Sequence, residues 1–202
     1  LERSATHWIA AGRPERALDP LQQAVARRVA TSDHRIAESY LALWADAMDA
    51  LGLAEDDPRR ARSAVLEATL RIYLADLDEA HRVLDPWLAI VGRFRGDPLF
   101  IDILNAAGRL ERLGGDPRTA IIHLDLAAAA AEELGDRPRL AEIRRQRADV
   151  AVAYGDLETA EACFVASQTD FAAIHHTLEQ ANCLRGRAMV ARMHKRRELA
   201  EQ

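Results

Sequence analysis

Apolar residues recur at spacings of three and four along most of this chain, the period of an amphipathic helix. In the segment 98–114 these positions are Ile103, Leu104, Ala107, Leu110 and Leu113. In the helix that follows, we expect Ile121, Leu124, Leu126 and Ala128 to face inward. No segment shows the alternating β-branched pattern of a strand, so we expect an all-α protein. The helices predicted in this way span 14–31, 35–51, 58–74, 77–95, 98–114, 117–134, 137–154, 157–174 and 177–194.

The helical pattern repeats every 40 residues. Four alanines stand at this spacing, and a small residue precedes each of them by twelve positions; the pairs are Ala68 with Ala80, Gly108 with Ala120, Ala148 with Ala160, and Ala188 with Ala200. Self-similarity at such a period is typical of stacked helical hairpins. We expect the small residues to lie where the two helices of a hairpin cross, because they allow close approach of the backbones.

Short turns separate the two helices of each predicted hairpin. A small residue followed by aspartate occurs at 75–76, 115–116 and 155–156. Glycine suits the left-handed residue that ends a helix, and aspartate can accept from the free amides that begin the next. Pro86 falls inside the predicted helix 77–95, where it predicts a kink or a break. The last copy, at 195–200, lacks the turn. The helix that carries Leu184 and Ala188 therefore lacks a complete partner, and we expect its apolar face to be exposed or covered by another molecule.

The order of these positions resembles the tetratricopeptide repeat. That family has a large apolar residue, a small residue, a glycine turn and an alanine, as in Leu104, Gly108, Gly115 and Ala120. The period of 40 instead of 34 and the polar Arg144 at a large-apolar position are departures from the family pattern. The resemblance implies a right-handed α-α superhelix of about ten antiparallel helices. We expect a single domain over 1–202, with atypical first helices in 1–33 and repeats at 34–95, 98–134, 137–174 and 177–202.

The segment 6–18 resembles the start of tetratricopeptide arrays in bacterial signal-transduction ATPases, which include maltose-type activators and LuxR-type regulators. The resemblance implies that the chain is a segment of a longer protein with an ATPase, kinase or cyclase domain elsewhere. We therefore expect a non-catalytic interaction, scaffold or sensor arm of a cytoplasmic regulator of signalling or transcription.

Composition excludes several other classes of protein. The net charge is −5 and no stretch approaches 18 apolar residues, which predicts no direct binding to nucleic acid and no membrane span. We interpret the single lysine among 27 basic residues as a trace of a GC-rich genome. A predicted hairpin that turns near His175 and His176 places Cys163 opposite about residue 187. Cys163 and Cys183 are therefore about one helical turn out of step, and we expect free thiols and a cytoplasmic location.

Motifs for catalysis, metals and cofactors are absent. The sequence contains no phosphate-binding loop, no His-Glu-x-x-His and no pair of Cys-x-x-Cys motifs. The adjacent His175 and His176 fit a solvated turn better than a metal site, because neighbouring side chains on a helix point in different directions. We expect this segment to be no enzyme and to hold neither metal nor cofactor.

The candidate site follows from the resemblance, because the first helix of each tetratricopeptide hairpin lines a concave groove. The family's offsets select Asn105, Arg109, Arg112, Arg145, Asp149, Asn182, Arg185 and Arg192, with Asp102, Glu142, Val152 and Met189 beside them. The same offsets extend the row to Arg62, Thr69, Ile72 and Tyr73.

Arginines on successive helices, about 10 Å apart, can clamp carboxylates of an acidic peptide or a phosphate. Two alternatives stay open at this point. The arginines can instead be structural, paired with Asp102, Glu142 or Asp149. The ligand can be a protein or peptide in the groove, or a small-molecule effector inside the superhelix.

Overall fold

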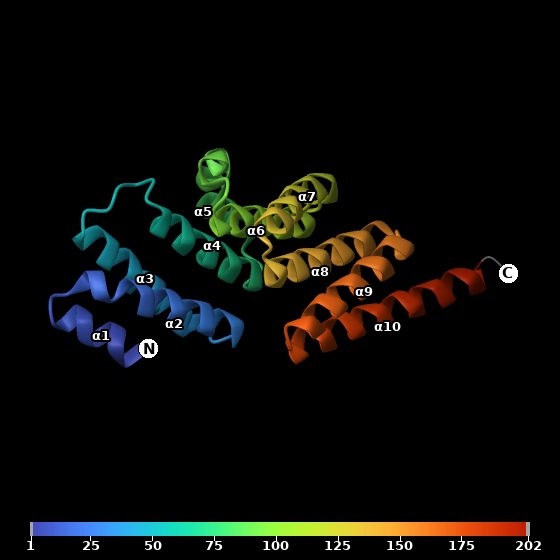
Figure 1. Cartoon of the computed structure of the whole chain (residues 1–202), viewed down its shortest axis with the longest axis horizontal. Coiled ribbons are helices and arrows are strands. Elements are labelled where there is room, and N and C mark those ends of the chain that lie inside the picture. Colours follow the sequence, from blue (N-terminus) through green and yellow to red (C-terminus); the bar gives the residue numbers. More distant parts are fainter. Residues whose placement is uncertain (1, 201–202) are drawn as a thin grey trace. The chain divides into compact units, whose positions relative to one another are not determined.

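The computed structural model describes residues 2–200, without the side chains of residues 2, 3, 198 and 200. This part of the chain contains only helices and turns, so the predicted all-α class is confirmed (Figure 1). The helices are α1 (Glu2–Ala10), η1 (Pro14–Arg16), α2 (Leu18–Ala30), α3 (His34–Ala50), α4 (Pro58–Tyr73), α5 (Leu77–Ala89), η2 (Val91–Phe94), α6 (Pro98–Gly114), α7 (Pro117–Leu134), α8 (Arg137–Tyr154), α9 (Leu157–Ala173) and α10 (Thr177–Ala200), where η marks a short 3₁₀ helix.

The chain forms two compact units, Leu1–Ile90 and Val91–Gln202. Their boundary falls inside the range 34–95 that was expected to form one repeat, and the single domain over 1–202 stays a prediction. In the first unit α2 packs on α1, α3 and α4, and α4 packs on α5. Trp44, Met48, Leu21 and Leu70 are fully buried there and form the centre of its core.

The second unit is a run of antiparallel helices in sequence order. Each helix from α6 to α10 packs on the next, and α8 also contacts both α6 and α10. The first helices of the successive hairpins, α6, α8 and α10, therefore lie next to one another, as expected for stacked hairpins. No helix within residues 2–200 combines the length and the apolarity needed to cross a bilayer.

The small residues lie at the crossings of paired helices, as predicted. A methyl group added to Gly108 would come within 2.7 Å of the Leu124 side chain and 3.2 Å of the Ala120 carbonyl oxygen. Ala148 and Ala160 are both fully buried and belong to one core cluster of α8, α9 and α10. Ala188, by contrast, is exposed. The side chain of Ala200 lies outside the described residues.

The turns between helices also follow the prediction. Gly115 and Gly155 have φ values of +89° and +77°, and Ala75 takes the same left-handed conformation at +59° in spite of its Cβ. The aspartate after each of these residues accepts from the backbone N–H three residues later, as Asp116 does from Thr119 at 3.1 Å. Two or three residues therefore separate each helix from the next, and these short turns bring consecutive helices together.

Two predicted helices end elsewhere. The predicted helix 77–95 is continuous through Pro86, so a break at the proline is wrong. The helix ends at Ala89, because Ile90, Val91 and Gly92 are weaker helix formers, and the chain continues there as η2. The predicted helix 177–194 continues to Ala200 because nothing in 195–200 interrupts it. The region 14–31 contains η1 and the shorter α2 in place of one helix.

Two leucines that the periodicity placed inward are exposed. Leu113 is 42% and Leu126 46% exposed. In α7 the buried face is formed by Leu124, Ala127 and Ala131. Leu126 lies about 200° around the helix from Leu124, since each residue turns by about 100°. In this alanine-rich helix, alanines and not Leu126 complete the buried face.

Candidate binding groove

A surface pocket of about 320 Å³ lies between α8, α9 and α10. A second pocket of about 230 Å³ adjoins it and shares Met189 and Arg192. We call the two pockets together the α8–α10 groove, which is lined by Arg145, Asp149, Phe164, Asn182, Arg185, Gly186, Met189, Arg192, Met193 and Arg196. Five of the eight predicted site residues thus lie in one place: Arg145, Asp149, Asn182, Arg185 and Arg192.

The floor of the groove contains a residue pair that the prediction missed. Phe164 of α9 reaches the groove because Gly186 of α10 has no side chain. A methyl group on Gly186 would lie 2.5 Å from Phe164 Cε1 and closer still to Cζ. The hairpin register inferred from the turn at His175 already placed 163 opposite 187. The same register places 164 opposite 186, so it could have predicted the contact between Phe164 and Gly186.

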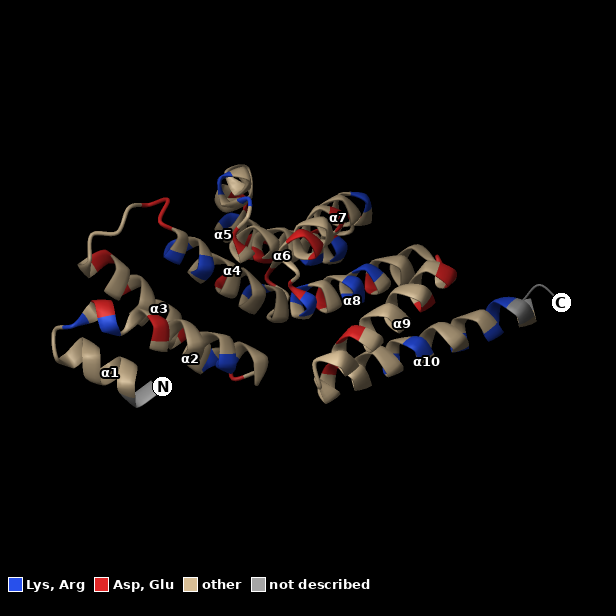
Figure 2. Cartoon of the chain, in the orientation of Figure 1, with Lys and Arg blue, Asp and Glu red and all other residues tan. Residues whose placement is uncertain are grey.

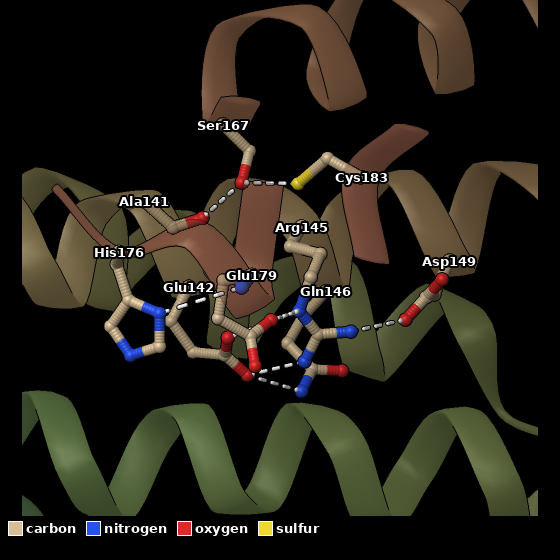
Figure 3. Close-up of polar contacts among 9 residues, drawn as sticks. All are labelled: Ala141, Glu142, Arg145, Gln146, Asp149, Ser167, His176, Glu179 and Cys183. Carbon is tan, nitrogen blue, oxygen red and sulfur yellow. Dashed lines mark hydrogen bonds and ion pairs between the residues drawn. The ribbon is translucent and has the colours of Figure 1, made fainter. Parts of the chain in front are cut away.

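Arg145 is held by three carboxylates inside the groove (Figure 3). Its guanidinium donates to Glu142 Oε1 at 2.5 Å and to Asp149 Oδ2 at 3.1 Å, and its Nε lies 3.3 Å from Glu179 Oε2 of α10. The side chain is only 21% exposed. A guanidinium this deeply placed requires opposite charges around it. Arg145 is therefore a structural arginine, paired with carboxylates of the protein, and not a free anion-binding one. Its contact with Glu179 links α8 to α10.

Burial and charge compete at this cluster. Burial by itself would lower the pKa of the Arg145 guanidinium, but the attraction of Glu142, Asp149 and Glu179 outweighs it, and the pKa rises. Burial raises the pKa of Asp149, although the positive charges of Arg145 and Arg112 act in the opposite direction. Desolvation thus dominates at Asp149 even though it has an ion-pair partner.

On α6, two buried polar atoms have no hydrogen-bond partner among the described residues. They are Nε of Arg112 and Oδ1 of Asn105, which lie two turns apart on one face of the helix with Arg109 between them. Burial lowers the pKa of Arg112, and Asp149 opposes this shift while Arg109 and Arg145 add to it. The charges of Arg109 and Arg112 on α6 and of Asp149 on α8 therefore influence one another.

The α10 side of the groove is cationic. Arg185 and Arg192 are exposed, and neither makes a hydrogen bond or an ion pair within the part of the chain that the structure describes. They lie seven residues apart on one helix, which corresponds to about 10 Å. The segment 185–197 contains six basic residues and no acidic one (Figure 2). Arg185 and Arg192 are thus unpaired within the described residues, but they lie on one helix and not on successive helices, so the predicted anion-binding row stays a prediction.

The other predicted groove positions lie elsewhere. Asp102 binds Arg139 through two hydrogen bonds of 2.6 and 2.9 Å, and Val152 packs against the core of α8, α9 and α10. The four residues predicted from α4 belong to the first unit. Of these, Ile72 is buried in its core, and the Thr69 hydroxyl donates to the Val65 carbonyl. The placement of Ile72 in the groove was therefore wrong.

Both cysteines are free thiols. Cys183 is buried beside the hydroxyl of Ser167, which in turn donates to the Ala141 carbonyl at 2.7 Å (Figure 3). Burial raises the pKa of Cys183 and of the half-buried Cys163, so both thiols are less reactive than an exposed cysteine. Among residues 2–200, no three side chains of the His, Cys, Asp and Glu types gather as a metal site.

No protein-family model matches this chain, and no curated protein is significantly similar to it.

Proposed function

We propose that this chain is a non-catalytic binding module of tetratricopeptide type that holds an acidic segment of a protein partner in the α8–α10 groove. The observation that carries the proposal is the pair of arginines Arg185 and Arg192, which line the groove together with Asn182 and have no ionic partner among the described residues. Guanidinium groups bind carboxylates in a bidentate manner, and two of them about 10 Å apart match two acidic side chains of a peptide.

The shape of the groove favours a chain segment over a compact ligand. Its two pockets adjoin along α10, and each is at or below the lower end of the volumes typical of small-molecule sites. Met189, Met193 and Phe164 provide an apolar floor between the charges. Methionine side chains adapt to different apolar groups, which suits a partner that inserts one apolar side chain between its acidic ones.

The module acts as an arm of a cytoplasmic regulator of signalling or transcription. Support for this role comes from the 40-residue repeat and from the resemblance of the segment 6–18 to the start of such arrays. Stacked helical hairpins present extended surfaces, and this suits recognition of a partner by an arm attached to a separate catalytic domain.

Titration of a fluorescent glutamate-rich peptide against the chain tests the proposal. Arg185→Ala and Arg192→Ala should each weaken binding about tenfold, because each removes one bidentate charge pair. The melting temperature should change by less than about 1 °C, since both side chains are exposed. Arg118→Ala, an exposed arginine of α7, is the matched control and should leave binding unchanged. If all three variants bind equally well, the groove is not the site.

A second candidate is a small anionic effector that binds on the α6 side. The unpartnered Arg112 Nε and Asn105 Oδ1 favour it, because buried polar atoms of this kind gain from a ligand that completes their hydrogen bonds. Inorganic phosphate and citrate are suitable probes in a thermal-shift titration. Stabilisation of the wild type that Arg112→Gln abolishes would support the effector, and no shift with either anion would exclude these two.

A further inference from the structure

We propose that the partner segment also carries a basic side chain, and that this side chain binds the carboxylates of Glu142 and Glu179. The proposal rests on the proposed function and specifies the partner further. We call the two carboxylates the acidic end of the α8–α10 groove. They adjoin the groove because both lie against Arg145, and because Asn182, which lines the groove, follows Glu179 by one turn of α10.

The acidic end differs from the corresponding place one repeat earlier. There Arg139 of α8 binds Asp102 of α6 through two hydrogen bonds of 2.6 and 2.9 Å. A shift of 40 residues takes Asp102 to Glu142 and Arg139 to Glu179. The contact between α6 and α8 therefore has opposite charges at this position, whereas the contact between α8 and α10 has two like charges.

One guanidinium serves both carboxylates of the acidic end (Figure 3). Arg145 Nε donates its single hydrogen to Glu142 Oε2 at 3.1 Å, and Glu179 Oε2 lies 3.3 Å from the same nitrogen. Glu179 Oε2 is buried and has no hydrogen-bond partner among the described residues. A buried carboxylate oxygen without a donor is unfavourable, so the acidic end gains from a further cation.

A second buried acceptor lies in the same cluster. Gln146 is only 2% exposed, and its Oε1 has no hydrogen-bond partner within the part of the chain that the structure describes. Figure 3 shows its amide beside the guanidinium of Arg145 and the carboxylate of Glu142. The side chains of Glu142 and Glu179 are partly exposed, so a ligand reaches them from solvent. A guanidinium or ammonium group supplies both the missing donors and the positive charge.

Positions along α10 set the spacing of the charges on the partner. Glu179 precedes Arg185 by six residues and Arg192 by thirteen. These separations correspond to about 9 Å and about 20 Å along the helix. An extended peptide covers about 3.4 Å per residue. A basic residue about three positions from one acidic residue and about six from a second therefore matches all three side chains.

Two fluorescent peptides test this pattern. The first is Arg-Ala-Ala-Glu-Leu-Ala-Glu-Ala-Ala-Arg, which has the required spacing in either chain direction. The second has glutamine in place of both arginines. Titration of each peptide against the full chain gives two dissociation constants, and their ratio is the preference for the basic residue.

The wild type should bind the arginine peptide at least about tenfold more tightly than the glutamine peptide, because a charge-assisted pair is gained. Glu179→Gln should reduce this preference to less than about threefold, since it removes one of the two carboxylates. Glu158→Gln, at an exposed position of α9, is the matched control. It changes the net charge of the protein equally and should keep the full preference.

Glu179→Arg provides a second variant with a folded precedent in the same chain. It recreates opposite Glu142 the arrangement in which Arg139 binds Asp102. We therefore expect a melting temperature no lower than that of the wild type. The preference should reverse, so that the glutamine peptide binds more tightly, because the new guanidinium repels the arginine peptide.

Three results would overturn the proposal. They are equal affinity of the wild type for the two peptides, the same preference in Glu179→Gln as in Glu158→Gln, and a retained preference for the arginine peptide in Glu179→Arg. Equal binding of both peptides that Arg185→Ala still weakens would refute only the basic residue and leave the proposed function intact. If neither peptide binds the wild type, both proposals fail.

Discussion

The contact between Gly186 and Phe164 provides a quantitative test of how α9 and α10 pack. Glycine inside a helix costs about 1 kcal/mol relative to alanine, so Gly186→Ala should stabilise α10 if only helix propensity mattered. The structure predicts the opposite sign. The new methyl group would meet three ring atoms of Phe164, with Cε1 at 2.5 Å and Cε2 at 2.8 Å, and this ring is 2% exposed within the core cluster.

The net effect follows from the difference between the two contributions. Overpacking of a filled core costs about 1–3 kcal/mol, and the rigid ring of Phe164 lies in a core cluster that also contains the fully buried Ala148 and Ala160. After subtraction of the gain in propensity, Gly186→Ala should destabilise the protein by about 1 kcal/mol. For a chain of this size that corresponds to a decrease of about 3 °C in melting temperature.

Chemical denaturation followed by circular dichroism measures this change. Gly114→Ala is the control, because a methyl group there meets nothing within 4 Å and should cost nothing. Phe164→Leu removes the ring atoms that clash, so its combination with Gly186→Ala should be more stable than the sum of the single changes by about 1 kcal/mol. If Gly186→Ala is as stable as Gly114→Ala, or if the two changes are simply additive, the close approach of the helices is wrong.

Two further predictions concern hydrogen bonds. Hydrogen bonds from Arg59, at 2.9 and 2.7 Å, lower the pKa of Asp57 to about 2. Asp57→Asn, which keeps a capping acceptor, should therefore cost about 1 kcal/mol at neutral pH. The difference in stability between the wild type and this variant should disappear as pH falls from about 4 to about 2, because only the ionised Asp57 carboxylate stabilises the fold. A difference in urea melts that stays constant over this pH range would refute the prediction. Ser167→Ala should cost about 1–2 kcal/mol by leaving the Ala141 carbonyl without its 2.7 Å donor, and an unchanged urea midpoint would contradict that bond.

Helix boundaries were predictable wherever a local signal marks them. Asp116 and Asp156 cap the helices that they were expected to begin, and the glycines before them take the left-handed conformation. These signals act within a few residues, so the sequence alone specifies them. At Pro86 the break, one of the two predicted outcomes, does not occur, because a missing N–H near the end of a helix removes one hydrogen bond without preventing the final turn.

The sequence predicted which residues lie together in the candidate groove, but not which of them form ion pairs. The offsets brought Arg145, Arg185 and Arg192 together, since residues at matching positions of stacked hairpins share a face. Their ionic states differ because the neighbours come from other helices. Glu179 of α10 reaches Arg145 of α8, whereas Arg185 and Arg192 have no carboxylate partner among the described residues.

The sequence by itself determined the helical class, the 40-residue period and the turns, because these depend on periodicity and on backbone conformation within a few residues. Tertiary structure alone decided which charges are paired and which side chains are covered. Ala148 and Ala188 occupy the same position of the repeat, yet one is fully buried and the other exposed. The difference arises because burial depends on whether a neighbouring helix packs over the position, and this cannot be read from the residue or its immediate neighbours.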